Sequence, residues 1–86
     1  MHYVYVLQSL NDNEAFYIGC SSDLRERLNS HNSGRNRATK HSQWRLVYYE
    51  AYLNLNSARQ REYRLKHHGS VKRHLMDRIK ASLSAE

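Results

Sequence analysis

The chain opens with the stretch His2-Tyr3-Val4-Tyr5-Val6-Leu7-Gln8, which places apolar and aromatic residues on both sides of an extended backbone. A strand without a polar side needs cover on both faces, so we expect it to be central in a sheet. The turn-forming cluster Asn11-Asp12-Asn13 follows it, and residues 15–19 resume a strand pattern. The two runs together predict a β-hairpin.

A helix is predicted directly after the hairpin. Ser21 or Ser22 can cap its first turn, where Asp23 also suits the positive end of the helix dipole. Gly34 should end the helix after about residue 33, because glycine readily takes the left-handed conformation that terminates helices. The polar residues 34–43 then form an unusually long connection, which favours a functional role for this segment.

Another strand and two more helices complete the chain. Residues 44–53 read as a strand, and Asn56 or Ser57 caps a second helix. That helix extends to about His67, and Gly69 ends it. Ser70 caps a third helix, in which apolar residues recur at a spacing of four: Val71, Leu75, Ile79 and Leu83. The pattern predicts one α+β domain over residues 1–86, with the order ββαβαα and helices packed on a three-stranded sheet.

The composition fits one small ordered domain. The chain has 86 residues, of which 40% are hydrophobic and 26% charged, enough for one sheet covered by a few helices. Cys20 is the only cysteine, so no internal disulfide can form and a reducing compartment is expected. No apolar run approaches the roughly 20 residues that cross a bilayer. The strand pattern begins at the N-terminus, so we expect no signal peptide and a cytoplasmic protein without membrane association.

The formal net charge is +6, and the positive charge is concentrated in the C-terminal third. The acidic residues there are Glu62, Asp77 and Glu86, and they are outnumbered by the basic residues Arg59, Arg61, Arg64, Lys66, Lys72, Arg73, Arg78 and Lys80. Such a surface is typical of proteins that bind a polyanion, most simply nucleic acid. It is equally consistent with a solvated helix face. For nucleic-acid contacts we single out basic residues of the polar connection and of the later helices: Arg35, Arg37, Lys40, Lys66, Lys72 and Arg73.

Glu62 stands out within the second predicted helix. It shares a helix face with Ala58 and Leu65, the apolar residues that should face the body of the protein. A carboxylate on that face needs a partner, because an unpaired buried charge is costly. The partner can be a cation, such as Arg27 or Lys66, or it can be a divalent metal ion.

The order of several of these residues resembles the GIY-YIG nuclease domain. The residues are Tyr3-Val4-Tyr5 in the first strand, Tyr17-Ile18-Gly19 in the second, Arg27 and His31 in the following helix, and Glu62 in a later helix. The resemblance covers nearly the whole chain and is greatest to small members related to the UvrC N-terminal nuclease domain. It implies a three-stranded antiparallel sheet flanked by about three helices.

The resemblance also implies roles for particular residues. Family members cut phosphodiester bonds with one divalent metal ion, Mg²⁺ or Mn²⁺, and Glu62 stands where the metal-binding glutamate stands. Arg27 corresponds to the arginine that holds the scissile phosphate. Tyr5 and Tyr17 correspond to the paired tyrosines, one of which activates the attacking water. His31 can contact phosphate or carry a proton, or it can simply cap or fill the helix end.

A phenol needs help to act as a base at neutral pH. The pKa of a free tyrosine is near 10, so we expect Arg27, His31, Lys66 or the metal ion to stabilise the phenolate and lower that pKa. The histidines do not indicate zinc, because they have no partner at the usual ligand spacing.

The function that these features predict is that of a metal-dependent endonuclease acting on DNA. Structure-specific cleavage of repair or recombination intermediates is expected. Its specificity must come from this domain, its basic C-terminal helices or a protein partner. One alternative is a module of the same fold that binds nucleic acid but has lost turnover. Another is a protein-interaction domain with an acidic partner.

Overall fold

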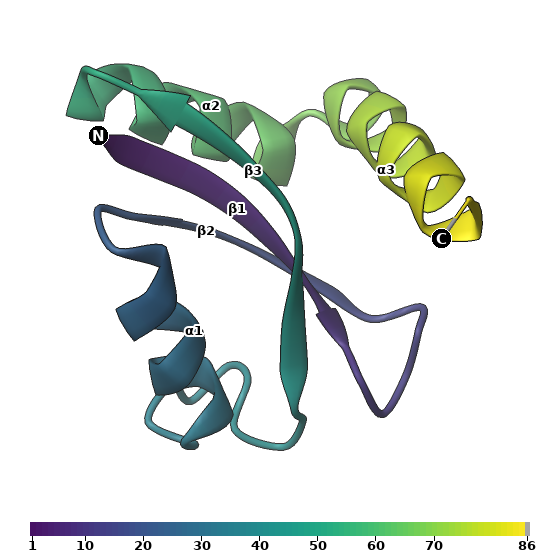
Figure 1. Cartoon of the computed structure of the whole chain (residues 1–86). Helices are drawn as coiled ribbons and strands as arrows, with labels where there is room; N and C mark the ends of the chain where they lie inside the picture. Colours follow the sequence, from purple (N-terminus) through teal and green to yellow (C-terminus); the bar gives the residue numbers. More distant parts are fainter. Residues whose placement is uncertain (86) are drawn as a thin grey trace.

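The structure is a computed structural model that describes residues 1–85. Its elements along the chain are β1 (His2–Ser9), β2 (Phe16–Ser21), α1 (Leu24–Asn32), β3 (Trp44–Tyr52), α2 (Leu55–His67) and α3 (Gly69–Ser84) (Figure 1). The predicted order ββαβαα and the α+β class are confirmed. None of the helices within residues 1–85 is long and apolar enough to cross a membrane.

The three strands form one antiparallel sheet in the order β2-β1-β3. β1 is therefore the central strand, as its apolar pattern predicts, and every residue from Val4 to Ser9 is buried. Tyr5 lies opposite Gly19 on one neighbour and opposite Tyr49 on the other. The β1–β2 hairpin is confirmed, and β2 is left as an edge strand.

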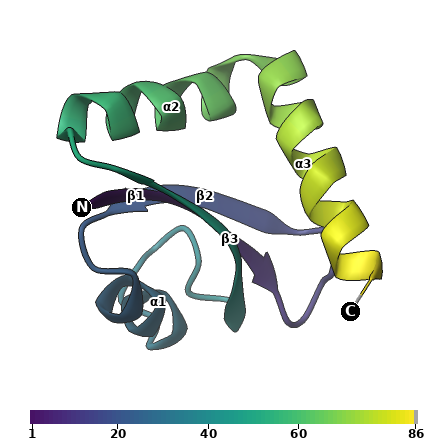
Figure 2. The same ribbon diagram turned by 45° about the horizontal axis from the view of Figure 1, so that its top comes forward.

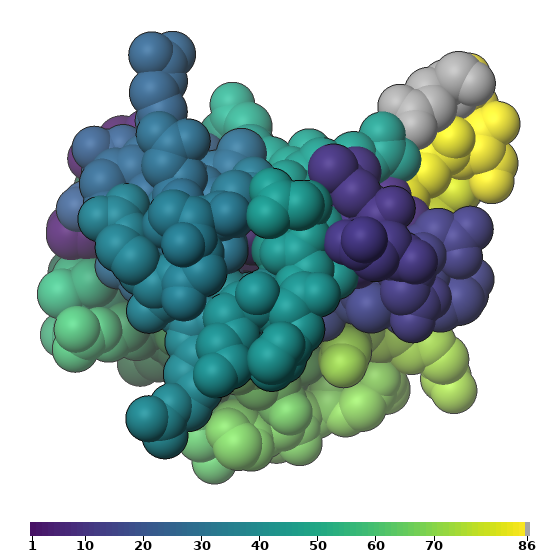
Figure 3. All heavy atoms as spheres, turned by 90° about the horizontal axis from the view of Figure 1, so that it is seen from below, coloured from purple at the N-terminus to yellow at the C-terminus, as the bar shows by residue number. Residues whose placement is uncertain are grey.

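Helices cover both faces of the sheet, because α2 and α3 pack on one face and α1 packs on the other (Figure 2). The first core cluster combines strand and helix residues: Val4, Val6, Ile18, Ala58, Leu65, Leu75, Met76 and Ile79. The second, on the α1 side, combines Tyr5, Leu7 and Trp44 with the partly buried Leu24 and Leu28. Seen from that side, α1 and the segment leading into β3 cover much of the sheet (Figure 3).

The caps of the first two helices differ from those expected. Asp23 caps α1, because its Oδ1 accepts a hydrogen bond of 3.1 Å from the backbone N–H of Glu26. Ser21 instead bonds to the backbone of Asp23 itself. Asn54 caps α2 by accepting from two backbone N–H groups. The cap of α1 thus lies later in the chain than predicted, and the cap of α2 lies earlier.

The junction between α2 and α3 also differs. Gly34 has a φ of 80° and ends α1 as predicted, but Gly69 has no positive φ. Gly69 is the first residue of α3, and His68 is the C-cap of α2 and the N-cap of α3. Ser70 therefore lies within α3 and does not cap it.

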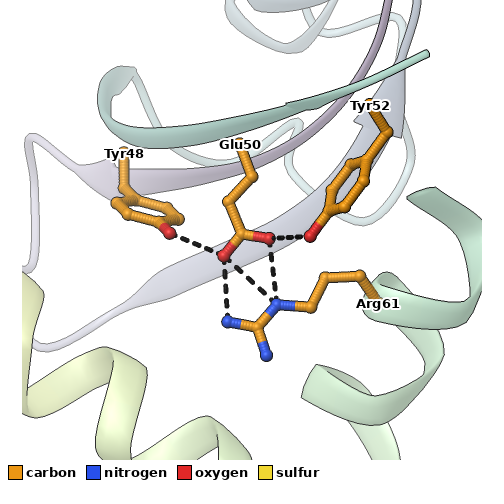
Figure 4. Close-up of polar contacts among 4 residues, drawn as sticks. All are labelled: Tyr48, Glu50, Tyr52 and Arg61. Carbon is orange, nitrogen blue, oxygen red and sulfur yellow. Dashed lines mark hydrogen bonds and ion pairs between the residues drawn. The ribbon is translucent and has the colours of Figure 1, made fainter. Parts of the chain in front are cut away.

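A carboxylate on β3 fastens α2 to the sheet (Figure 4). Glu50 accepts hydrogen bonds of 2.6 Å from the hydroxyls of both Tyr48 and Tyr52, and of 2.9 Å from Nε and Nη2 of Arg61. Burial raises the pKa of Glu50, but the hydrogen bonds from Arg61 and the two tyrosines outweigh it and hold that pKa below its usual value. Arg61 therefore belongs to the structural framework rather than to a free basic surface.

Candidate active site

Tyr5 on β1 lies directly over Gly19 of β2. A Cβ atom at Gly19 would overlap the hydroxyl and Cζ of Tyr5. The glycine is thus needed because the aromatic ring occupies the space of a side chain. Tyr5 is only 2% exposed, so its phenol is nearly shut off from solvent.

His31 lies behind Tyr5 and is completely buried. Its Nε2 is 2.9 Å from the Tyr5 hydroxyl, and its Nδ1 is 2.7 Å from Oγ1 of Thr39. Burial, and then the nearby Arg27, lower the pKa of His31 below its usual value, so the ring is neutral near pH 7. Thr39 Oγ1 donates to the carbonyl of Asn36 and is free to accept from Nδ1–H. Nε2 then accepts a hydrogen bond from the Tyr5 hydroxyl.

Thr39 is a residue of the candidate site that sequence reasoning missed. It is 2% exposed, although it lies in the polar segment between α1 and β3. Its carbonyl accepts from Nε1 of Trp44 at 3.0 Å, which ties the segment to the second core cluster. The length of the segment was the only signal of its role, because nothing local marks one threonine for burial.

Tyr17 stands between this buried network and the surface. It is half-buried, and its ring centroid is 4.9 Å from that of His31 and 6.5 Å from that of Trp44. The Nζ atom of Lys66 lies 5.6 Å from the Tyr17 ring centroid, close enough for a cation–π contact. Tyr17 therefore links the α1 side of the sheet to α2 around the β2 edge.

Arg27 lies on α1 next to the same network. It is half-buried, and its guanidinium has no hydrogen-bond or ion-pair partner within residues 1–85. Its positive charge acts to lower the pKa of Tyr5, of His31 and of Cys20, although burial is the larger influence on each. A half-buried guanidinium without a partner is well placed to receive an anion.

Glu62 approaches the site from α2. Its Oε2 is 3.2 Å from Nζ of Lys66, so the cation that pairs with it is Lys66 and not Arg27. Its side chain remains 24% exposed. It lines an open pocket of about 370 Å³ whose other residues come from α2, from the start of β1 and from the end of β2 and the residue after it: Leu55, Arg59, His2, Cys20, Ser21 and Ser22.

The electrostatics of Tyr5 differ from the expectation for the paired tyrosines. Burial raises its pKa, and Tyr17 and Glu62 add to the rise, while Arg27 opposes it without compensating. His31 contributes no positive charge because it is neutral. Tyr5 therefore stays protonated and hydrogen-bonded, and the expectation that Arg27 and His31 lower its pKa below the usual value is wrong.

A divalent metal ion at this site would have Glu62 as its carboxylate ligand. No three His, Cys, Asp or Glu side chains gather as a metal site anywhere in the described chain. Glu62 offers one hard carboxylate beside an open polar pocket that has room for waters and a phosphate. Mg²⁺ commonly takes one or two carboxylates and fills its remaining positions with water and phosphate oxygens, so this arrangement fits it. The ammonium group of Lys66 would have to share or release the carboxylate.

The six basic residues expected to contact nucleic acid do not form one surface. Arg35, Arg37 and Lys40 are exposed in the segment after α1, on one side of the sheet. Lys72 and Arg73 are exposed on α3, on the opposite side. Lys66 alone lies beside the tyrosines and Glu62.

The fold and the site together define a small nuclease-type domain, with tyrosines on a hairpin, an arginine on the next helix and a glutamate on a later one. Residues 1–75 match the family model described as the GIY-YIG catalytic domain. The chain therefore belongs to the GIY-YIG family. This family of nuclease domains acts on nucleic acid and generally uses a divalent metal ion.

Relatives support the assignment. The chain is 38% identical over 69 residues to a UPF0213 protein of Bacillus pumilus, which covers 76% of this chain and 66% of that protein. It is 36% identical over 70 residues to a UPF0213 protein of Clostridium perfringens, and the matched region covers 77% of this chain and 71% of that protein. A UPF0213 protein of Oceanobacillus iheyensis is 32% identical over 69 residues, with 76% of both covered. No solved structure matches the chain.

Proposed function

We propose that the protein is a divalent-metal-dependent endonuclease that hydrolyses phosphodiester bonds in DNA, with structure-specific action on repair or recombination intermediates. The observation that carries the proposal is the convergence at the β2 edge of Tyr17, Arg27 and Glu62, which come from three different elements. A structural core has little use for an unpartnered guanidinium and a partly exposed carboxylate beside two tyrosines.

The residues divide into those that meet the substrate and those that support them. Arg27 binds a non-bridging oxygen of the scissile phosphate and offsets the charge that builds up during attack. Tyr17 is the more accessible phenol and contacts the attacking water. Tyr5 and His31 support the site from its buried side, where their hydrogen bond fixes both side chains. Glu62 would hold one Mg²⁺ or Mn²⁺ ion, which when bound supplies charge neutralisation and polarises the phosphate.

A nucleic-acid-binding module without turnover is the second candidate. The contact between Lys66 and Glu62 favours it, because an ammonium group at 3.2 Å competes with a metal ion for the carboxylate. In that case Lys66, Arg27 and the exposed basic residues would serve phosphate binding alone.

Cleavage of labelled linear, nicked, flapped and branched DNA in Mg²⁺ or Mn²⁺ distinguishes the two. For the nuclease, Glu62→Ala removes metal-dependent cutting while the melting temperature stays close to that of the wild type. Tyr17→Phe should lower kcat by about 10²–10⁴, the usual worth of a proton-transfer group. Undiminished cutting by Glu62→Ala would reject the metal assignment. Salt-sensitive binding without cutting in both proteins would establish the silent module.

A further inference from the structure

The outward side of α2 carries an aromatic residue that the core does not use. The buried side of this helix consists of Ala58 and Leu65, both 0% exposed. Tyr63 points away from them and is 60% exposed. It lines an open groove of about 510 Å³ whose other residues are Asn56, Arg59, Gln60, Arg64 and His68. This groove, formed by those six residues, is called the α2 groove below.

The Tyr63 ring is held in place by its neighbours. Its centroid is 4.3 Å from that of His67, one helical turn on, with the planes tilted by 32°. The ring of His68 lies 6.2 Å away in an edge-on arrangement. An aromatic ring that is already supported loses little conformational freedom when a planar ligand stacks on it.

The charges of the α2 groove suit a polyanion. Arg59 and Arg64 are exposed, and neither guanidinium has an ion-pair or hydrogen-bond partner in the part of the chain that the structure describes. Arg61 on the same helix, by contrast, is bound to Glu50. The lining contains no carboxylate, and Asn56 and Gln60 add amide groups that can bond to base edges.

The α2 groove adjoins the pocket beside Glu62. Arg59 lines both the α2 groove and the pocket beside Glu62. Tyr63 directly follows Glu62 in the chain, so the two side chains leave the same helical turn in different directions. Tyr63 lines the α2 groove, and Glu62 lines the neighbouring pocket. A strand whose phosphate lies beside Glu62 can therefore pass Arg59 and reach Tyr63 with a neighbouring nucleotide.

We propose that the α2 groove binds an unpaired nucleotide, whose base stacks on Tyr63 while Arg59 and Arg64 contact its phosphates. Base stacking on an exposed aromatic ring is available only to nucleotides that have left the double helix. The groove therefore selects single-stranded nucleic acid or the unpaired part of a flap or branch. The role of this selectivity in cleavage rests on the proposed function. The binding of an unpaired nucleotide does not depend on turnover.

The test measures binding without chemistry. Fluorescence anisotropy of labelled oligonucleotides in EDTA gives the Kd of single-stranded DNA, of RNA of the same sequence and of duplex DNA. Tyr63→Ala should weaken single-strand binding by roughly 5- to 150-fold, which corresponds to the loss of one base–aromatic stack. Duplex binding should change less than twofold. Tyr63→Phe keeps the ring and should bind as the wild type does.

A matched control is available on the sheet. Tyr49 of β3 is 55% exposed, similar to Tyr63, but does not line the α2 groove. Tyr49→Ala should leave single-strand binding unchanged. A preference for DNA or for RNA among the single strands identifies the natural ligand, and either one supports the site.

Three results would overturn the proposal: wild-type affinity in Tyr63→Ala, an equal loss in Tyr63→Phe, or an equal loss for duplex and single strand. The failure of the proposed nuclease is seen separately. If the wild type cuts no DNA in Mg²⁺ or Mn²⁺ while Tyr63→Ala loses single-strand affinity, the nuclease is rejected and the α2 groove stands. If cutting depends on Glu62 while Tyr63→Ala binds normally, the nuclease stands and the groove is rejected.

Discussion

Replacing Gly19 by alanine tests how tightly β1 and β2 interlock at the candidate site. The added Cβ would overlap the hydroxyl and Cζ of Tyr5 and lie 2.9 Å from its Cε1. The ring has little room to withdraw, because Tyr5 is 2% exposed and its hydroxyl is bonded to His31 at 2.9 Å. The substitution must therefore displace the ring, the edge strand or both.

The cost follows from two contributions. Overpacking of a well-packed core costs about 1–3 kcal/mol. Separating Tyr5 from His31 adds roughly 1–3 kcal/mol, because both polar groups would then be buried without a partner. We expect Gly19→Ala to lower the free energy of unfolding by about 2–6 kcal/mol, a large part of the roughly 5–15 kcal/mol typical of such domains.

Urea denaturation followed by far-UV circular dichroism measures the change. Gly69→Ala is the matched control, because no atom lies within 4 Å of its added Cβ and its φ is not positive. It should leave stability within about 1 kcal/mol of the wild type. The second control places Gly19→Ala in a Tyr5→Ala background, where the obstacle is gone.

The double-mutant comparison decides the argument. If the clash with Tyr5 is the cause, most of the cost of Gly19→Ala disappears once the ring is removed. Equal urea midpoints for Gly19→Ala and Gly69→Ala would refute the reasoning. An unchanged cost in the Tyr5→Ala background would refute it as well.

Two further predictions concern ionisation. Glu50→Gln leaves the half-buried Arg61 without its carboxylate and should cost about 1–3 kcal/mol, less than a fully buried pair because the guanidinium remains 29% exposed. The pKa of Glu50 is lowered in the folded protein, so its contribution to stability is complete above the usual value of 4.5 and is lost as the pH falls through the lowered value. The difference in urea midpoint between the wild type and Glu50→Gln should therefore disappear at acid pH. A difference that does not depend on pH would contradict this. His31 should stay neutral below its usual pKa of 6.5, so the unfolded chain takes up its proton first and stability should begin to fall as the pH drops below 6.5. An NMR titration of the ring protons checks this, and a midpoint of His31 at or above the usual 6.5 would exclude a buried neutral ring.

The architecture was accessible from the sequence because its signals are local. The two-sided apolar pattern of β1, the turn cluster after it and the four-residue spacing in α3 each lie within one element. The capping residues were missed because several adjacent side chains can cap, and only the start of the helix selects among them. Asp23 and Asn54 are the caps because the position at which the preceding strand ends determines where each helix begins.

The candidate site was accessible only in outline. Its residue types could be named, but the burial of His31 behind Tyr5 depends on a segment that folds back to supply Thr39. The choice of Lys66 as the partner of Glu62 depends on how α2 approaches the sheet edge. Likewise, Arg61 could not be separated from the other basic residues, because its partner Glu50 lies on a different element.

The single residue between α2 and α3 fixes the rotational phase of the last helix. His68 is the entire non-helical spacer, so the direction in which α3 presents its apolar side is set by the end of α2. One inserted residue would turn α3 by about 100° about its axis. Leu75, Met76 and Ile79 would then leave the first core cluster together. The junction between α2 and α3 therefore has no tolerance for a change of length.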